Sequence, residues 1–140
     1  MIRIDLDGLP VSANKERGKV RAAIRQRSAY KRDVWVQVHE ARLTGLSLGS
    51  KASPLRVEIV YVLGPKSRNR DTLSNMEKTL LDALQSAGVI TDDRWVKMGE
   101  VASIPGPADR TLVKIFQTQA LTPEQLEAWW ETSNPNMEAS

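Results

Sequence analysis

The sequence predicts an α+β fold, in which a mixed four-stranded β-sheet packs with two main helices and a short C-terminal helix. Its 140 residues, 41% of them hydrophobic, are enough for one domain with a single core. Segments with the two-residue period of strands alternate with segments of helical period, in the order strand, loop, helix, strand, helix, two strands. We expect one domain over residues 1–120, followed by an acidic helix and tail over residues 121–140.

The N-terminal third is expected to contain one strand and one helix. Apolar residues at positions 2, 4 and 6 alternate with polar ones, which predicts a strand that ends at Asp7-Gly8. Residues 9–27 have no sustained apolar period, and we interpret them as a long basic loop. From Ser28 to Gly45 apolar residues recur at helical spacing. Three alternating valines in this segment would also suit a strand, but the surrounding length and charge pattern favour a helix.

The middle of the chain predicts a strand and a second helix. Residues 55–63 alternate, and their second half is apolar on both faces, as expected of a central strand covered from each side. Ser74 and Glu77 form a capping box at the start of the next helix, and Gly88 ends it.

Two more strands are expected at 95–103 and 110–118, and the turn Pro105-Gly106-Pro107 between them indicates an antiparallel pair. Thr122 then caps a short acidic helix. We expect its Trp129 and Trp130 to cover a core edge or a dimer surface.

The composition excludes several classes of protein. The chain has no cysteine, so it has no disulfide scaffold, thiolate zinc site or cysteine nucleophile, and with His39 as its one histidine a histidine-rich metal site is not expected. No apolar run approaches the roughly 20 residues of a membrane span, and the start lacks a signal-peptide core. We therefore expect a cytoplasmic protein without a membrane partner.

Basic residues concentrate near the N-terminus. The net charge is +3, but the last twenty residues hold four glutamates and no Lys or Arg, so the first 120 residues carry 20 basic against 13 acidic side chains, or +7. Residues 15–32 hold eight of these basic residues against Glu16. Such a run is often only a solvated loop, but it could also bind the phosphates of DNA. The residues we expect to contact DNA are Asn14, Lys15, Arg17, Lys19, Arg21, Arg25, Arg27, Arg68 and Arg70.

Polar residues that could support phosphodiester chemistry gather between positions 69 and 93. Asn75, Lys78 and Asp82 are spaced three and four apart and share one face of the second helix, just after Asp71. Carboxylate and amide oxygens suit Mg²⁺, and a lysine beside them can stabilise a phosphate.

The same segment matches a known family at spaced positions. The matching residues are Asp71, Ser74-Asn75, Lys78, Asp82-Ala83-Leu84, Ala87-Gly88-Val89 and Asp92-Asp93, with weaker matches at Pro10–Asn14 and Ser28–Asp33. This pattern resembles the RusA family of Holliday junction resolvases. The resemblance implies a RusA-like fold and a small homodimeric, Mg²⁺-dependent endonuclease, often encoded by phages or prophages. Such an enzyme makes paired cuts in four-way DNA junctions during DNA recombination and repair, and Mn²⁺ is a possible substitute for Mg²⁺.

Carried over by position, the resemblance makes Asp71 and Asp93 metal ligands and Lys78 the lysine needed for cleavage. Asn75 matches the amide of the motif, and Asp82 and Asp92 are supporting residues. The sequence departs from the family at Ser74, which stands in place of a second metal-ligating aspartate, and Asp71 lies four rather than three positions before Asn75. A hydroxyl is a weaker ligand than a carboxylate, so we expect lower metal affinity or activity unless Glu77 or Asp92 supplies the missing charge. The alternative is a catalytically weakened or inactive branched-DNA-binding protein of the same family.

The distance between the two aspartates raises a further alternative. A helix of about 14 residues runs about 20 Å, which separates Asp93 from Asp71. Either residues 88–92 double back along the helix, or Asp93 of a two-fold partner completes the site. We favour the partner.

Each site residue also has an explanation without chemistry. Asp71 and Ser74 suit a helix start, Lys78 and Asp82 could be an exposed pair, and Asp92-Asp93 could be turn residues. A small interaction domain unrelated to DNA therefore remains a third interpretation. It is their joint occurrence that favours function.

Overall fold

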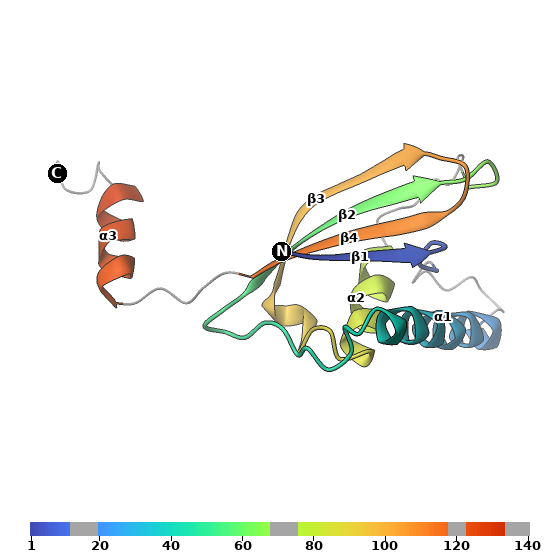
Figure 1. The fold of residues 1–140 in the computed structure, drawn as a ribbon, viewed down its shortest axis with the longest axis horizontal. Helices are drawn as coiled ribbons and strands as arrows, with labels where there is room; N and C mark the ends of the chain where they lie inside the picture. The colour runs from blue at the N-terminus through green and yellow to red at the C-terminus, as the bar shows by residue number, and fades with distance from the viewer. Residues whose placement is uncertain (12–19, 68–75, 118–122, 134–140) are drawn as a thin grey trace.

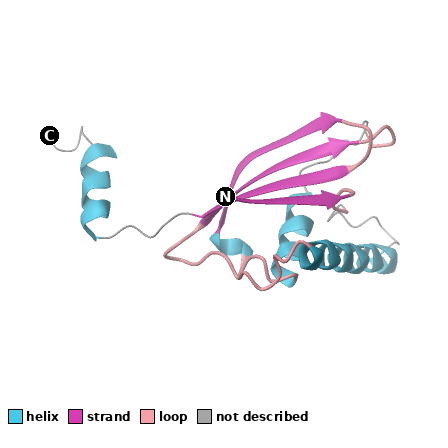
Figure 2. Cartoon of the chain, in the orientation of Figure 1, coloured by secondary structure: helices cyan, strands magenta, loops and turns pink. Residues whose placement is uncertain are grey.

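The computed structural model describes residues 1–11, 20–67, 76–117 and 123–133. In chain order, the elements are strand β1 (Ile2–Asp7), helix α1 (Val20–Glu40), strand β2 (Leu55–Leu63), helix α2 (Met76–Ser86), the 3₁₀ turn η1 (Asp93–Trp95), strands β3 (Val96–Pro105) and β4 (Arg110–Gln117), and helix α3 (Pro123–Ser133). Figures 1 and 2 show helices α1 and α2 below one face of the four-stranded sheet. The predicted α+β class is confirmed.

The strand order in the sheet is β1-β4-β2-β3. Strand β2 lies between β3, which runs parallel to it, and β4, which runs antiparallel to it. The prediction that the last two strands pair with each other is therefore wrong. The Pro105-Gly106-Pro107 turn signal located the reversal correctly, but β2 lies between the two strands.

The connection from β3 to β4 passes over the end of β2. Its Gly106 donates a backbone hydrogen bond to the carbonyl of Leu63 at 2.9 Å, and a Cβ at this glycine would lie 2.2 Å from Cγ1 of Val62. Asp109 then accepts hydrogen bonds from the N–H of Gly64 at 2.7 Å and from the hydroxyl of Ser67 at 2.8 Å. One turn thus fixes the ends of both β2 and β3.

Strand β3 contains a bulge. Val57 of β2 is opposite Met98, whereas Ile59 is opposite Val101, so two residues of β3, Gly99 and Glu100, face one residue of β2. A Cβ at Gly99 would lie 2.9 Å from Cγ of Glu58, which explains a residue without a side chain here. Such a bulge bends and twists the strand that carries it.

The hydrophobic core lies between the sheet and the two helices. The inward residues of the strands pack with Leu80 and Leu84 of α2 and with three of the four apolar residues that predicted the first helix, Tyr30, Val34 and Val38. The fourth, Ala41, lies beyond the end of α1 and is exposed. The strand alternative for the three valines is thereby wrong.

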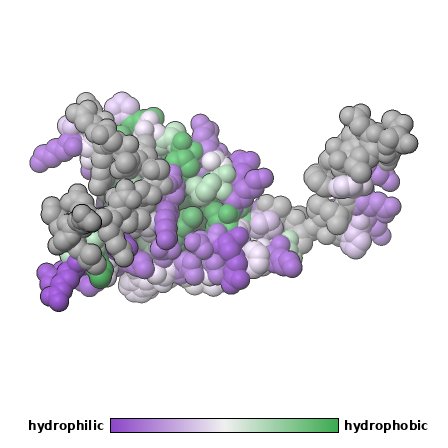
Figure 3. Space-filling view, turned by 180° about the vertical axis from the view of Figure 1, so that it is seen from behind, coloured by the Kyte–Doolittle hydropathy of each residue, from purple (hydrophilic) through white to green (hydrophobic). Residues whose placement is uncertain are grey.

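The helices cover one face of the sheet, so the expectation that β2 is covered from each side is also wrong. On its outer face Val62 is buried beneath Gly106, while Val60 is half-buried and Ile104 of β3 remains 47% exposed. Seen from behind, hydrophilic side chains dominate the described surface, and apolar ones gather in a smaller area (Figure 3).

Helix α1 begins earlier than predicted. Residues 20–27, assigned above to the basic loop, are helical, and residues 12–19 lie outside the described residues. Ala22, Ala23 and the neighbouring Arg and Gln residues have high helix propensity. Their side chains are mostly exposed, so this part of the helix needs no apolar stripe. The apolar period from which we predict helices is therefore absent here.

Both main helices end in the same backbone motif. In α1, the N–H of Leu43 donates to the carbonyl of Val38, and Arg42 takes a left-handed conformation with φ 60°. In α2, the equivalent bond joins Val89 to Leu84, and Gly88 has φ 75°. These are the bonds of a Schellman cap. The predicted stop at Gly88 is confirmed, whereas α1 ends at Glu40, before the expected Gly45.

The predicted C-terminal helix is present as α3, which stands apart from the sheet in Figure 1. Its Trp130 is 53% exposed. Trp130 therefore does not cover a core edge, the first of its two expected places, and the second, a dimer surface, stays a prediction. The side chain of Trp129 lies outside the described residues. Within the described residues, no helix is both long and apolar enough to cross a membrane.

Candidate functional site

The structure describes part of the predicted site. Outside the described residues lie Asp71, Ser74 and Asn75, the adjacent Arg68 and Arg70, and the N-terminal Asn14, Lys15, Arg17 and Lys19. Within them lie Lys78 and Asp82 on α2, Asp92 and Asp93 ahead of β3, and Arg21, Arg25 and Arg27 on α1.

Lys78 and Asp82 lie one turn apart on α2, as expected from their spacing. Lys78 is exposed and Asp82 is half-buried, while the core stripe occupies the opposite side of the helix. Among the ion pairs of the described residues, none joins these two side chains. The Lys78 ammonium is thus not neutralised by Asp82, which speaks against the interpretation of the two as a simple surface pair.

Buried hydroxyl groups lie close to the start of α2. The hydroxyls of Tyr30, Tyr61 and Thr79 are buried and have no hydrogen-bond partner among the described residues. Burial raises the pKa of Tyr61, and the carboxylate of Glu77 in the first turn of α2 raises it further. Glu77 is itself half-buried. Its charge therefore acts at the same end of α2 as Lys78.

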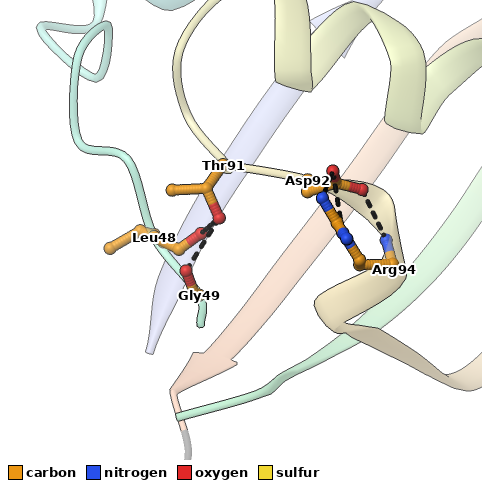
Figure 4. Close-up of polar contacts among 5 residues, drawn as sticks. All are labelled: Leu48, Gly49, Thr91, Asp92 and Arg94. Carbon is orange, nitrogen blue, oxygen red and sulfur yellow. Dashed lines mark hydrogen bonds and ion pairs between the residues drawn. The ribbon is translucent and has the colours of Figure 1, made fainter. Parts of the chain in front are cut away.

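Asp92 is already engaged by its neighbour. Its carboxylate caps η1 by accepting from the N–H of Arg94 at 3.0 Å, and it accepts from the Arg94 guanidinium at 3.0 Å (Figure 4). The Arg94 amide first, and then its guanidinium, lower the pKa of the Asp92 carboxyl. These bonds give Asp92 a structural role, which is to hold the start of η1.

The segment that delivers Asp92 and Asp93 is held beside residues 47–49. Thr91 donates its N–H to the carbonyl of Leu48 at 3.0 Å. Its hydroxyl donates to the carbonyl of Gly49 at 2.7 Å (Figure 4). The chain then enters β3, whose first residue, Val96, pairs with Leu55 at the start of β2.

Asp93 and Ser67 therefore lie near opposite ends of β2. Ser67 is bonded to Asp109 beyond the last residue of the strand, and nine strand residues span about 26 Å. Ser67 leads directly into residues 68–75, where Asp71 is found in the sequence. Asp93 is exposed and comes from the other end.

A metal ion would need residues beyond those described. No group of three or more acidic or histidine side chains close enough to hold a metal occurs within residues 1–11, 20–67, 76–117 and 123–133. The oxygen donors of Asp71, Ser74 and Asp93 are of the kind that Mg²⁺ takes together with bound water. The expected metal site thus depends on the segment 68–75.

The described part of the basic segment is a helix rather than a loop, and this change brings residues together that the sequence analysis kept apart. Arg21 and Arg25, and further along Arg32, all exposed, fall on one side of α1. On the same side, the rings of Trp35 and His39 stack with centroids 4.8 Å apart and planes 7° from parallel. This ring pair was not predicted from the sequence, although its spacing of four residues was a usable signal.

In comparisons with known proteins, no family model matches the chain, and no curated protein shows significant similarity to it.

Proposed function

We propose that the chain is a Mg²⁺-dependent, structure-specific DNA endonuclease of the RusA type that acts in the cytoplasm as a homodimer and resolves four-way junctions. The observation that carries the proposal is Lys78, an exposed cation that Asp82 does not neutralise. It stands at the start of α2, four residues after Ser74 and seven after Asp71. A cation beside metal-binding carboxylates can stabilise the charge that develops when a phosphodiester is hydrolysed.

The roles of the residues follow from their chemistry. Asp71 and Asp93 would hold Mg²⁺, with Ser74 as a weaker neutral ligand. When bound, this ion would supply charge neutralisation and a more acidic water. Lys78 would stabilise the charge that develops on the phosphate, and Asn75 would orient the site. Asp82, half-buried one turn from Lys78 on the same helix face, would be a supporting residue of the site.

The position of Glu77 favours it over Asp92 as the source of the missing negative charge. Glu77 lies in the first turn of α2 beside Lys78, whereas the Asp92 carboxylate binds Arg94.

A synthetic four-way junction incubated with Mg²⁺ or Mn²⁺ tests the activity. We expect paired cuts by the natural chain and a loss of about a hundredfold or more in rate for Lys78→Met, the scale seen when a charge-stabilising group is removed. Lys97→Met, which removes an exposed lysine from edge strand β3, is the matched control and keeps the rate. Equal rates for both variants would contradict the role of Lys78.

Mixing variants tests whether Asp93 acts from the partner. If each site joins Asp71 of one protomer to Asp93 of the other, a mixed dimer of Asp71→Asn and Asp93→Asn subunits contains one intact site and one doubly altered site. We therefore expect two inactive proteins to regain nicking activity when mixed. Continued inactivity of verified mixed dimers would place both aspartates in the same subunit.

The alternative is a branched-DNA-binding protein that has lost turnover, and Ser74 favours it because a hydroxyl replaces a carboxylate. This alternative predicts junction binding without cleavage and a gain of cleavage in Ser74→Asp. A chain with neither junction binding nor salt-dependent affinity for DNA would contradict both proposals.

A further inference from the structure

The outer face of α1 combines cations with exposed aromatic rings. At 100° per residue, Arg21, Arg25, Arg32, Trp35 and His39 fall within an arc of about 80° around the helix axis. This arc lies opposite the buried stripe of the same helix, and all five side chains are exposed. We refer to these five residues as the α1 outer face.

The three arginines are available for an anionic ligand. None of them forms an ion pair within the part of the chain that the structure describes. The two acidic residues of α1, Asp33 and Glu40, fall outside the arc. From Arg21 to Arg32 the helix rises about 16 Å, which is the length of about five phosphates along one strand of B-DNA.

The ring pair lies at the end of this cationic row. Trp35 is 45% exposed, so a large part of its apolar surface contacts water. Its indole stacks on the His39 ring. The Nδ1 atom of His39 also lies 3.5 Å from the hydroxyl oxygen of Thr44. A pair spaced four apart can stabilise a helix by itself. That explanation does not account for the row of unpaired arginines beside it.

We infer that the α1 outer face binds a single nucleic-acid strand, with its phosphates on Arg21, Arg25 and Arg32 and an unpaired base stacked on the Trp35–His39 pair. Cationic surfaces with aromatic rings recognise single strands in this way, and the stacking is tolerant of base identity. The inference rests on the proposed function for the choice of DNA, because a branched substrate can expose unpaired bases at the branch point. A protein partner fits less well, since the arc contains three cations and no acidic residue.

The test measures DNA binding by the full chain without divalent metal, so that binding is separated from cleavage. The probe is a labelled oligothymidylate of about 20 nucleotides, longer than most single-strand binding sites, and anisotropy gives Kd. We expect Trp35→Ala to weaken binding about tenfold and Trp35→Phe to keep most of the affinity. With an abasic strand of equal length, Trp35→Ala has no effect, because no base remains to stack.

The arginines are tested by the salt dependence of the same binding. In Arg21→Gln/Arg25→Gln/Arg32→Gln, the slope of log K against log salt falls by about 2, since each phosphate contact to a single strand contributes about 0.7. The control Arg3→Gln/Lys97→Gln/Lys114→Gln removes the same charge from exposed positions on the sheet and leaves the slope nearly unchanged.

Three results would overturn the inference. They are unchanged oligothymidylate affinity in Trp35→Ala, an equal loss on the abasic strand, and equal slopes in the two triple variants. A dimer that becomes monomeric in Trp35→Ala without loss of DNA affinity would instead assign the α1 outer face to a second copy of the chain. If the natural chain cleaves junctions and Trp35→Ala keeps the oligothymidylate affinity, only this inference is refuted. If Trp35→Ala weakens strand binding as expected but the natural chain does not cleave junctions, only the proposed enzyme is refuted.

Discussion

The carboxylate of Asp109 accepts a hydrogen bond of 2.7 Å from the backbone N–H of Gly64, 45 residues earlier in the chain. Its second oxygen accepts from Ser67, and its own carbonyl accepts from the N–H of Gly8. Asp109 thus joins the ends of β1 and β2 to the start of β4. Asp109 also holds Ser67, the last described residue before positions 68–75, which contain Asp71 in the sequence.

Loss of the Asp109 side chain should therefore destabilise the fold. We expect Asp109→Ala to lower the free energy of unfolding by about 1–3 kcal/mol, because the N–H of Gly64, a buried residue, loses its acceptor. Asp109→Asn keeps an acceptor oxygen and should lose less. Urea denaturation measures both, and equal stability of Asp109→Ala and the natural chain would refute the role.

The two helix ends differ at a single equivalent position, and this difference predicts opposite effects. Arg42 has a left-handed conformation that costs a residue with a side chain about 1 kcal/mol, whereas Gly88 adopts it freely. We expect Arg42→Gly to stabilise the protein by about 0.5–1 kcal/mol. Gly88→Ala should destabilise it by at least as much, since its Cβ would also lie 3.1 Å from the backbone nitrogen of Gly45. Thermal unfolding of the two variants should shift in opposite directions.

The contact between Gly106 and Val62 predicts a coupled pair. The Cβ of Gly106→Ala would clash with Cγ1 of Val62, so we expect a loss of about 1–3 kcal/mol. In a Val62→Ala background the clashing methyl is absent, and the same substitution should cost less. The coupling energy from a double-mutant cycle measures this difference. A coupling near zero would show that the turn moves instead of Val62.

The buried tyrosines predict sensitivity to alkali. Burial raises the pKa of Tyr30 and Tyr61 above the ordinary value of about 10. Above this pH the unfolded chain ionises while the folded chain resists, so stability is complete below pH 10 and falls as the pH rises further. One pH unit above 10, each tyrosine costs about 1.4 kcal/mol.

The corresponding phenylalanine variants isolate this effect. Because the Tyr61 hydroxyl has no hydrogen-bond partner among the described residues, Tyr61→Phe should unfold at the same urea concentration as the natural chain, or a higher one, near pH 8. Near pH 11 it should be clearly more stable. A constant difference at both pH values would contradict the raised pKa.

Glu77 and Asp92 are two carboxylates with different expected roles in cleavage. Asp92 is bound by Arg94, and Glu77 lies beside Lys78 in the first turn of α2. We expect Glu77→Gln to lower the junction cleavage rate about tenfold or more, and Asp92→Asn to change it little. Glu100→Gln, an exposed change on β3, is the control. A larger loss in Asp92→Asn would reverse the assignment.

Elements with a regular apolar period could be predicted from the sequence. The strand at 55–63 and the stop at Gly88 matched because burial on one face imposes a period, and a left-handed cap favours glycine. Residues 20–27 were misassigned because their helix is mostly exposed, so propensity was the remaining signal. Strand partners could not be predicted, because local turn residues do not encode that β2 lies between β3 and β4.

For the candidate site, the composition stays a prediction, and the structure tests only part of the arrangement. The shared face of Lys78 and Asp82 follows from helical spacing and is present in the structure. The bonds of Asp92 to Arg94, by contrast, depend on a 3₁₀ turn that the sequence pattern did not predict. The stacking of Trp35 on His39 was missed because both were weighed singly and not as neighbours on one helix.

The bulge in β3 has a consequence for solubility at high concentration. Strand β3 is an outermost strand of the sheet, and a long, flat outermost strand can recruit another chain and start aggregation. The bulge at Gly99 and Glu100 interrupts the regular row of backbone donors and acceptors along β3. Pro105, the last residue of β3, has no N–H to donate. At the opposite margin, β1 is short and carries exposed Arg3, Asp5 and Asp7. Both margins of the sheet are thereby poor templates for fibril growth.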